Sequence, residues 1–190
     1  MRRLVVFNNI TLDGYFTGVN GDFSWAHGAA GSDDAEFNAF VAGNASGESQ
    51  LLFGRVTYEM MASYWPTPAA MQNFPAVAAG MNRSRKVVFS RTLSHAGWSN
   101  TQLISSHIVT AVRKMKQEEG PGMAILGSGS IVAQLSPENL VDEYQFVVNP
   151  VVLGAGRTLF EGLKERLTLK LVQSRTFKNG KVYLCYQPMA

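Results

Sequence analysis

The sequence predicts a single α/β domain in which a mixed β-sheet carries helices on both faces. The chain has 190 residues, of which 46% are hydrophobic and 16% charged, as expected for one globular domain. Through its first three quarters, short apolar runs alternate with helical patterns, which predicts a largely parallel sheet. The last quarter is rich in strand-forming residues and contains an Asn-Gly pair, so we expect it to end in an antiparallel hairpin.

The first elements follow from an apolar run and an amphipathic segment. Residues 4–8 form an apolar run that predicts a buried strand, and the glycines of residues 11–31 predict a long loop. A helix is expected next, because Ser32 can cap it and acidic residues occupy its first turn. Phe37 and Phe40 lie on one face of this helix.

The middle of the chain continues the alternation. A strand over residues 50–53 leads at Gly54 into a helix over residues 55–63. A loop with two prolines then precedes a weaker helix near residues 71–81, and residues 86–89 form the third strand.

The next elements complete the parallel part of the sheet. Residues 101–104 form a short strand, and the helix over residues 106–118 has its apolar residues on one side. Residues 123–126 form a strand that leads through a glycine-rich turn into a helix over residues 130–135.

The last quarter contains the predicted antiparallel strands. Residues 143–152 are apolar and β-branched, interrupted only by Asn149-Pro150. Residues 167–175 and 181–187 flank the three-residue turn 178–180. These strands are expected at the edge of the sheet.

Composition and charge exclude several classes of function. The net charge of +3 comes from scattered basic residues, so we expect no nucleic-acid partner. Cys185 is the only cysteine, which excludes an internal disulfide and favours a reducing, cytoplasmic location. The three histidines have no ligand-like spacing, so no metal site is expected. The N-terminal apolar run is too short for a signal peptide, and no run is long enough to cross a membrane.

The junction at Gly54 has the features of an anion-binding turn. A strand ends at this glycine and a helix begins directly after it, with Arg55 and Thr57 in the first turn. The glycine allows close approach to the backbone, unpaired N–H groups point outward, and Arg55 adds charge. The alternative is an ordinary strand-to-helix turn, with Arg55 in solvent and paired to Glu59 one helical turn later.

A second junction repeats this arrangement about seventy residues later. Gly127, Ser128, Gly129 and Ser130 follow an apolar strand and precede a helix, and could hold a pyrophosphate through N–H groups and hydroxyls. Two junctions in one small domain suggest a ligand with several phosphates, of which a dinucleotide is the natural candidate. A true Rossmann domain is not expected, because Val132 occupies the third glycine position and no acidic residue follows at the spacing of a ribose contact.

Ser90 and Arg91 follow the third strand and are expected at the same edge of the sheet. Ligands of parallel sheets collect at the carboxyl ends of the strands. Arg91 and Arg55 could therefore hold a ribose 2′-phosphate through their planar guanidinium groups, which would favour the phosphorylated nicotinamide cofactor. The alternative is two unrelated surface arginines.

The loop after the first strand contains the candidates for substrate contacts. Asp13-Gly14 is a turn by default, but the loop could also cover the nicotinamide, with Asp13 facing the substrate and Trp25 as a wall. Asn8, at the end of the first strand, is a further candidate for substrate binding. Asp33 and Asp34 are candidates for acid–base catalysis, although helix capping alone would account for both.

Other chemistries lack their characteristic motifs. The sequence contains no Cys-x-x-Cys or His-x-Glu of a zinc deaminase and no Gly-x-Ser-x-Gly of an esterase. It also contains no Gly-x-x-x-x-Gly-Lys of a P-loop nucleotidase.

Four segments of the chain, in order, resemble the dihydrofolate reductase-like superfamily. The resemblance is greatest to the branch with the reductase domain of the bifunctional riboflavin-biosynthesis deaminase–reductase, the RibD C-terminal domain. The segments are residues 11–15 (Thr-Leu-Asp-Gly-Tyr), 52–59, 124–130 (Ala-Ile-Leu-Gly-Ser-Gly-Ser) and 140–156. The chain has no counterpart of the upstream deaminase domain, so a free-standing reductase is expected.

The resemblance implies a sheet of about eight strands, an NADPH site and often a homodimer. It implies that Gly54, Arg55 and Thr57 meet a cofactor phosphate and that Ser90 and Arg91 meet the adenosine end. Residues 127–130 would cradle the pyrophosphate. It further implies that Asp13 borders the substrate pocket and that Phe160 ends a segment shaping that pocket. Asp33 and Asp34 compete for the place of the helix acid of dihydrofolate reductases.

We therefore expect residues 1–190 to form an NADPH-dependent reductase of a pyrimidine- or pteridine-like heterocycle. The closest named reaction is the reduction of 5-amino-6-(5-phosphoribosylamino)uracil. The alternatives are a dihydrofolate reductase and an NADP-binding dimer with little catalytic activity. Dimerisation is expected through the apolar strand around residues 146–153 or through the C-terminal hairpin.

Overall fold

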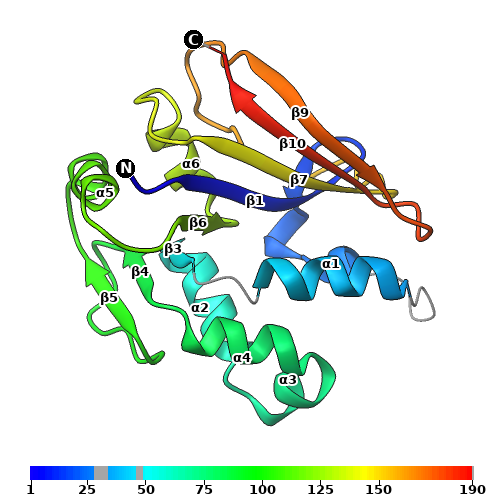
Figure 1. Cartoon of the computed structure of the whole chain (residues 1–190), viewed down its shortest axis with the longest axis horizontal. Helices are drawn as coiled ribbons and strands as arrows, with labels where there is room; N and C mark the ends of the chain where they lie inside the picture. The colour runs from blue at the N-terminus through cyan, green and yellow to red at the C-terminus, as the bar shows by residue number, and fades with distance from the viewer. Residues whose placement is uncertain (28–33, 46–48, 190) are drawn as a thin grey trace.

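A computed structural model of the protein describes residues 1–27, 34–45 and 49–189 (Figure 1). Within these residues the α-helices are α1 (Ala35–Ala45), α2 (Arg55–Tyr64), α3 (Pro68–Asn73), α4 (Pro75–Arg83), α5 (Ile108–Gln117) and α6 (Gly129–Leu135). Two short 3-10 helices, η1 (Val19–Gly21) and η2 (Ser24–His27), precede α1. The strands are β1 (Leu4–Thr11), β2 (Tyr15–Thr17), β3 (Gln50–Gly54), β4 (Lys86–Phe89), β5 (Thr101–Ile104), β6 (Met123–Leu126), β7 (Glu143–Asn149), β8 (Arg157–Thr158), β9 (Leu169–Thr176) and β10 (Val182–Pro188).

Eight strands form the central sheet in the order β5-β4-β3-β6-β1-β7-β10-β9. The six strands from β5 to β7 are parallel, while β10 runs antiparallel to both β7 and β9. Figure 1 shows the β9–β10 hairpin at one side of the molecule. The predicted mixed sheet with a C-terminal antiparallel hairpin is confirmed.

Helices cover both faces of the sheet, as predicted. On one face, Val112 of α5 and Ile131 and Leu135 of α6 pack in a core with Leu4 and Val6 of β1. On the other face, α2 and α4 cover β3 and β4, and α1 packs its phenylalanines against β7 and the hairpin. Residues that alternate along each strand therefore enter different cores, as the two-residue period of a strand requires.

Two of the predicted element boundaries differ because of proline. The weak helix expected near residues 71–81 is two helices, and each begins at a proline, Pro68 or Pro75. Proline suits the first helical position, because its missing N–H would have no partner there. The Thr67 hydroxyl caps α3 by accepting a hydrogen bond from the amide of Ala70 at 3.2 Å.

The first strand is longer than expected, and two further strands are new. β1 continues to Thr11 because β7 pairs with it up to Asn149, the residue before Pro150. β2 and β8 form a separate antiparallel pair that the sequence patterns did not predict. The expected cap Ser32 lies outside the described residues.

Candidate functional site

The candidate site lies at the carboxyl edge of the parallel strands. Gly54 ends β3 and pairs in register with Phe89, the residue before Ser90. Gly127 follows β6, which lies between β3 and β1. Both glycine junctions and the turn at Ser90 therefore share one edge, which is where ligands of open α/β sheets bind.

The two glycine junctions are joined directly by hydrogen bonds. The amide of Gly54 donates to the Ser128 hydroxyl at 2.9 Å, and this hydroxyl donates to the Leu126 carbonyl at 3.1 Å. In return, the amide of Ser128 donates to the Thr57 hydroxyl oxygen at 3.1 Å. The starts of α2 and α6 are thus held together across 71 positions of sequence, and the Thr57 hydroxyl keeps its hydrogen for another acceptor.

Glycine is required at position 127 by both conformation and space. The backbone of Gly127 has a φ of +58°, and a Cβ atom there would lie 2.9 Å from Thr57 Cγ2. At Gly129, a Cβ atom would meet the carbonyl oxygen of Leu159 at 3.1 Å and the ring of Phe16 at 3.2 Å. Both glycines therefore keep the start of α6 close to its neighbours and free of side-chain bulk.

Arg55 pairs with Glu59, which the sequence offered as the alternative to anion binding. Its guanidinium donates to the Glu59 carboxylate at 2.8 Å, and both side chains are about half exposed. An exposed pair of this kind contributes little to stability, so a phosphate could displace Glu59 at small cost. Thr57, in the first turn of the same helix, is half-buried.

Ser90 and Arg91 differ in their surroundings. The Ser90 hydroxyl accepts hydrogen bonds from the amides of Thr92, at 3.2 Å, and Leu93, at 2.9 Å, which shapes the turn after β4. Arg91 is exposed and forms no ion pair with the residues that the structure describes.

Asn8 and Asn149 are buried polar residues on β1 and β7. The Asn8 side-chain amide donates to the Gly127 carbonyl at 3.4 Å, which places it beside the second junction. Asn149 was missed by the sequence analysis. Its amide nitrogen donates to Asn9 Oδ1 and the Ile10 carbonyl, both at 3.2 Å, while its Oδ1 has no donor among the described residues. The only signal in the sequence was its place at the break before Pro150.

The Asp13 carboxylate is occupied by donors from two segments. It accepts from the Thr11 hydroxyl at 2.6 Å and from the amides of Leu153, at 3.1 Å, and Gly154, at 2.8 Å. These donors, with Thr11 first, hold the pKa of the Asp13 carboxyl below its usual range.

Asp34 has the contacts of a helix cap. Its Oδ1 accepts from the amides of Glu36 and Phe37, both at 3.0 Å, and its Oδ2 accepts from the amide of Asn179 at 3.1 Å. These amides, with Phe37 first, lower the pKa of the Asp34 carboxyl. The other candidate acid, Asp33, lies outside the described residues.

The two aromatic candidates, Trp25 and Phe160, pack against different parts of the fold. The Trp25 indole nitrogen donates to the Asp22 carbonyl at 3.2 Å, and its ring packs edge-on against Phe23. Phe160 follows Leu159, which touches the start of α6, and its ring packs against Tyr144 and Phe146.

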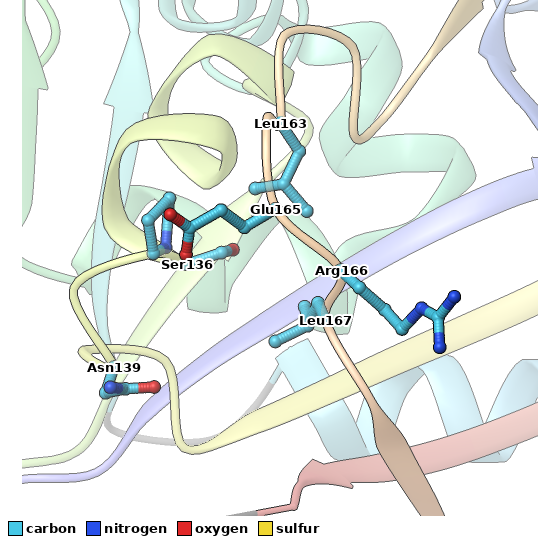
Figure 2. Close-up of a pocket in the computed structure, with 7 residues that line it drawn as sticks. Ser136, Asn139, Leu163, Glu165, Arg166 and Leu167 are labelled. Carbon is cyan, nitrogen blue, oxygen red and sulfur yellow. The ribbon is translucent and has the colours of Figure 1, made fainter.

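A small pocket of about 140 Å³ lies at the opposite end of α6 from the glycine junction. Figure 2 shows Ser136 and Asn139 on one side of it, and Arg166 pointing away from the other labelled residues. The Ser136 hydroxyl donates to the Val132 carbonyl at 2.8 Å and accepts from the Tyr144 hydroxyl at 2.7 Å. The Ser136 hydroxyl is therefore used within the fold, and we assign the candidate site to the glycine junctions.

The described residues contain neither a membrane-spanning helix nor a metal-binding cluster. No helix among them is long and apolar enough to span a membrane. No cluster of three or more His, Cys, Asp or Glu residues among them could hold a metal ion.

Sequence comparisons match nearly the whole chain. A family model of the RibD C-terminal domain matches residues 2–183. The uncharacterized protein YyaP of Bacillus subtilis (strain 168) is 30% identical over 185 residues, which cover 97% of this chain and 94% of YyaP.

Solved structures with the same fold include reductases. A putative riboflavin biosynthesis protein from Shewanella sp. PV-4 has a TM-score of 0.74 and 20% identity, covering 99% of each chain. A bifunctional deaminase/5-amino-6-(5-phosphoribosylamino)uracil reductase from Thermotoga maritima has a TM-score of 0.68 and 14% identity, covering 99% of this chain and 57% of that one. Dihydrofolate reductase from Enterococcus faecalis, solved with NADP(H), has a TM-score of 0.64 and 15% identity, covering 99% and 97%. These likenesses show a dihydrofolate reductase-like fold.

Proposed function

The chain belongs to the RibD C-terminal domain family, and from this premise we propose that it is an NADPH-dependent reductase of a pyrimidine- or pteridine-like heterocycle. The observation that carries the proposal is the direct hydrogen bonding between the Gly54 and Gly127 junctions. Two helix starts meet at one point of the sheet edge, as a ligand with several phosphates requires. We propose that residues 1–190 form one reductase domain that acts in the cytoplasm, where its single, buried thiol stays reduced.

The residues of the site fit the pyrophosphate and the ribose phosphate of NADPH. Gly127 and Gly129 let the start of α6 pack closely against Thr57, Phe16 and Leu159, and the exposed Ser130 hydroxyl can donate to a phosphate oxygen. Thr57 can donate its hydroxyl hydrogen while it holds Ser128 in place. We assign the adenosine end to Ser90 and Arg91.

The protein would accelerate the reaction mainly by orienting the cofactor and the substrate. When bound, NADPH supplies the hydride at C4 of its nicotinamide ring. Asn8 lies on β1 and donates to the Gly127 carbonyl, where it can order the edge of the site next to the reacting rings. A substrate held there in one orientation needs no covalent contact with the protein, and water or an acid completes the protonation.

Replacement of Arg91 by Ala is expected to weaken NADPH binding roughly 10- to 100-fold and to leave NADH binding unchanged. Arg91 is exposed, whereas Arg55 is engaged by Glu59, so Arg91 is the better placed partner for a 2′-phosphate. Fluorescence titration with each cofactor measures the effect, with Arg113→Ala as a control for the loss of a surface charge. Equal losses for NADPH and NADH in the Arg91 variant would remove Arg91 from the phosphate site.

The substrate is identified by oxidation of NADPH in the presence of candidate heterocycles. We expect turnover with 5-amino-6-(5-phosphoribosylamino)uracil, and dihydrofolate is the second candidate. Binding of NADPH without oxidation by either compound would instead favour a cofactor-binding protein with little catalytic activity. Binding of neither cofactor would reject the proposal.

We further propose that the protein forms a homodimer through the C-terminal hairpin. β7 is hydrogen-bonded on both sides by β1 and β10, so its residues 143–149 have no free edge to offer. β9 is an edge strand, and its Leu171 and Val172 side chains are 47% and 44% exposed. Light scattering at micromolar concentration is expected to give twice the monomer mass, and Leu171→Lys to give the monomer.

A further inference from the structure

We infer that Asp13 is a positioning residue. Its carboxylate holds the two-stranded β2–β8 pair in place against the second glycine junction. This inference rests on the proposed function. It deepens that function by assigning to Asp13 a role in cofactor affinity instead of proton transfer.

The Asp13 carboxylate joins two distant segments of the chain. Asp13 lies in the turn after β1, and its carboxylate accepts from the amides of Leu153 and Gly154, 140 and 141 residues later. The amide of Leu12 also donates to the Val151 carbonyl at 2.9 Å. The turn at residues 11–14 and the loop at residues 151–154 therefore form one unit, which we call the Asp13 latch.

The Asp13 latch leads directly into the β2–β8 pair. Directly after the latch, Gly156 approaches the β2 backbone so closely that a Cβ atom would lie 2.2 Å from the Thr17 carbonyl oxygen. Tyr15 and Thr158 then pair across β2 and β8. Each strand has only two or three residues, so the pair depends on the latch to hold its two ends together.

The β2–β8 pair packs against the second glycine junction. Phe16 of β2 and Leu159, which follows β8, are both buried, with exposures of 7% and 2%. Their ring and carbonyl oxygen are the two groups that a side chain at Gly129 would strike. A contiguous series of contacts thus joins the Asp13 carboxylate to the start of α6.

Proton donation by Asp13 would require different surroundings. A general acid works best with a pKa near the operating pH, which for a carboxyl means a raised value. The donors around Asp13 favour its ionised form, and they use both of its oxygens. This carboxylate is arranged to stay charged and to hold the loop.

Asp13→Asn tests the inference through hydrogen exchange and NADPH titration. We expect faster exchange of the amides of residues 151–158 and 127–131, and NADPH binding about 3- to 30-fold weaker. With a substrate in hand, the pH dependence of kcat should keep its shape. Thr11→Val removes one of the three donors and also the acceptor of the Tyr15 amide of β2. It should change exchange and NADPH binding in the same direction, and it covers the case of poor folding in Asp13→Asn.

Asp22→Asn is the matched control. Its carboxylate also accepts from a backbone amide, that of Ser24 at 3.0 Å, but this contact is local and joins no distant segment. The amides of the control should exchange, and the control should bind NADPH, like the wild type.

Two results in Asp13→Asn would overturn the inference. One is faster amide exchange at residues 151–158 without any change at residues 127–131. The other is unchanged exchange with loss of one limb of the pH profile of kcat. Failure of the wild-type protein to bind NADPH would reject the proposed function, while the exchange of the two segments would still decide the role of Asp13.

Discussion

Gly127→Ala is expected to weaken NADPH binding on the order of 100-fold. The added Cβ would lie 2.9 Å from Thr57 Cγ2 and 3.0 Å from Thr57 Oγ1. Thr57 is β-branched and stands in the first turn of α2, so it cannot rotate away freely. Its displacement would break the hydrogen bond from the Ser128 amide and separate the two junctions.

The backbone conformation adds a second cost, which the experiment must separate from the clash. An alanine at a φ of +58° is strained by about 1–2 kcal/mol. Gly162 also has a positive φ, +91°, but a Cβ atom there would meet nothing within 4 Å. Gly162→Ala therefore carries backbone strain alone and should bind NADPH like the wild type. If Gly127→Ala also bound NADPH normally, the cofactor would have to lie elsewhere.

The glycine junctions could be predicted because their signal is local. An apolar run, a glycine and a helix-forming segment lie within ten residues at Gly54 and again at Gly127. The parallel order of the strands then places both at the same edge. Their mutual hydrogen bonds could not be predicted, because the contact of Ser128 with Thr57 depends on β6 being the neighbour of β3, which no local pattern encodes.

The contacts of Asp13 and Asn149 show what sequence patterns leave out. Asp13-Gly14 has the ordinary composition of a turn, and the partners of Asp13, Leu153 and Gly154, are 140 and 141 residues away. Asn149 looked like an interruption within an apolar segment, yet it donates to β1 from a buried position. In both cases the decisive partner is brought by the pairing of β1 with β7, so the residue type alone gave no sign of its role.

The fold was predictable to the extent that periodicity and turn chemistry determine it. Alternation of strands and helices and the Asn179-Gly180 turn predicted the mixed sheet and the hairpin. Among the boundaries that failed were those at Pro68 and Pro75, where proline begins a helix instead of ending one. β2 and β8 are too short to produce an alternation and are stabilised by tertiary contacts.

Asp142→Ala is expected to lower the free energy of unfolding by about 2–4 kcal/mol. The Lys116 ammonium, whose side chain is 8% exposed, forms an ion pair with the Asp142 carboxylate and donates to the Leu140 carbonyl at 3.0 Å. The same carboxylate accepts from the amide of Leu4 at 2.7 Å, at the start of the central strand β1. Removal of Asp142 leaves a buried ammonium without its counter-ion and a strand end without its acceptor, and both losses are costly.

A second ion pair between the same two parts of the chain provides the control. Arg113 of α5 pairs with Glu138, just as Lys116 pairs with Asp142, but the side chains of this pair are 54% and 40% exposed. Glu138→Ala should therefore cost no more than about 0.5 kcal/mol in urea denaturation at neutral pH. The double variant Lys116→Met, Asp142→Ala should regain part of the stability lost in Asp142→Ala, because it removes the unpaired charge as well. Equal losses in Asp142→Ala and Glu138→Ala would show that burial of Lys116 does not decide the strength of this contact, and that β1 is held at its start by the sheet alone.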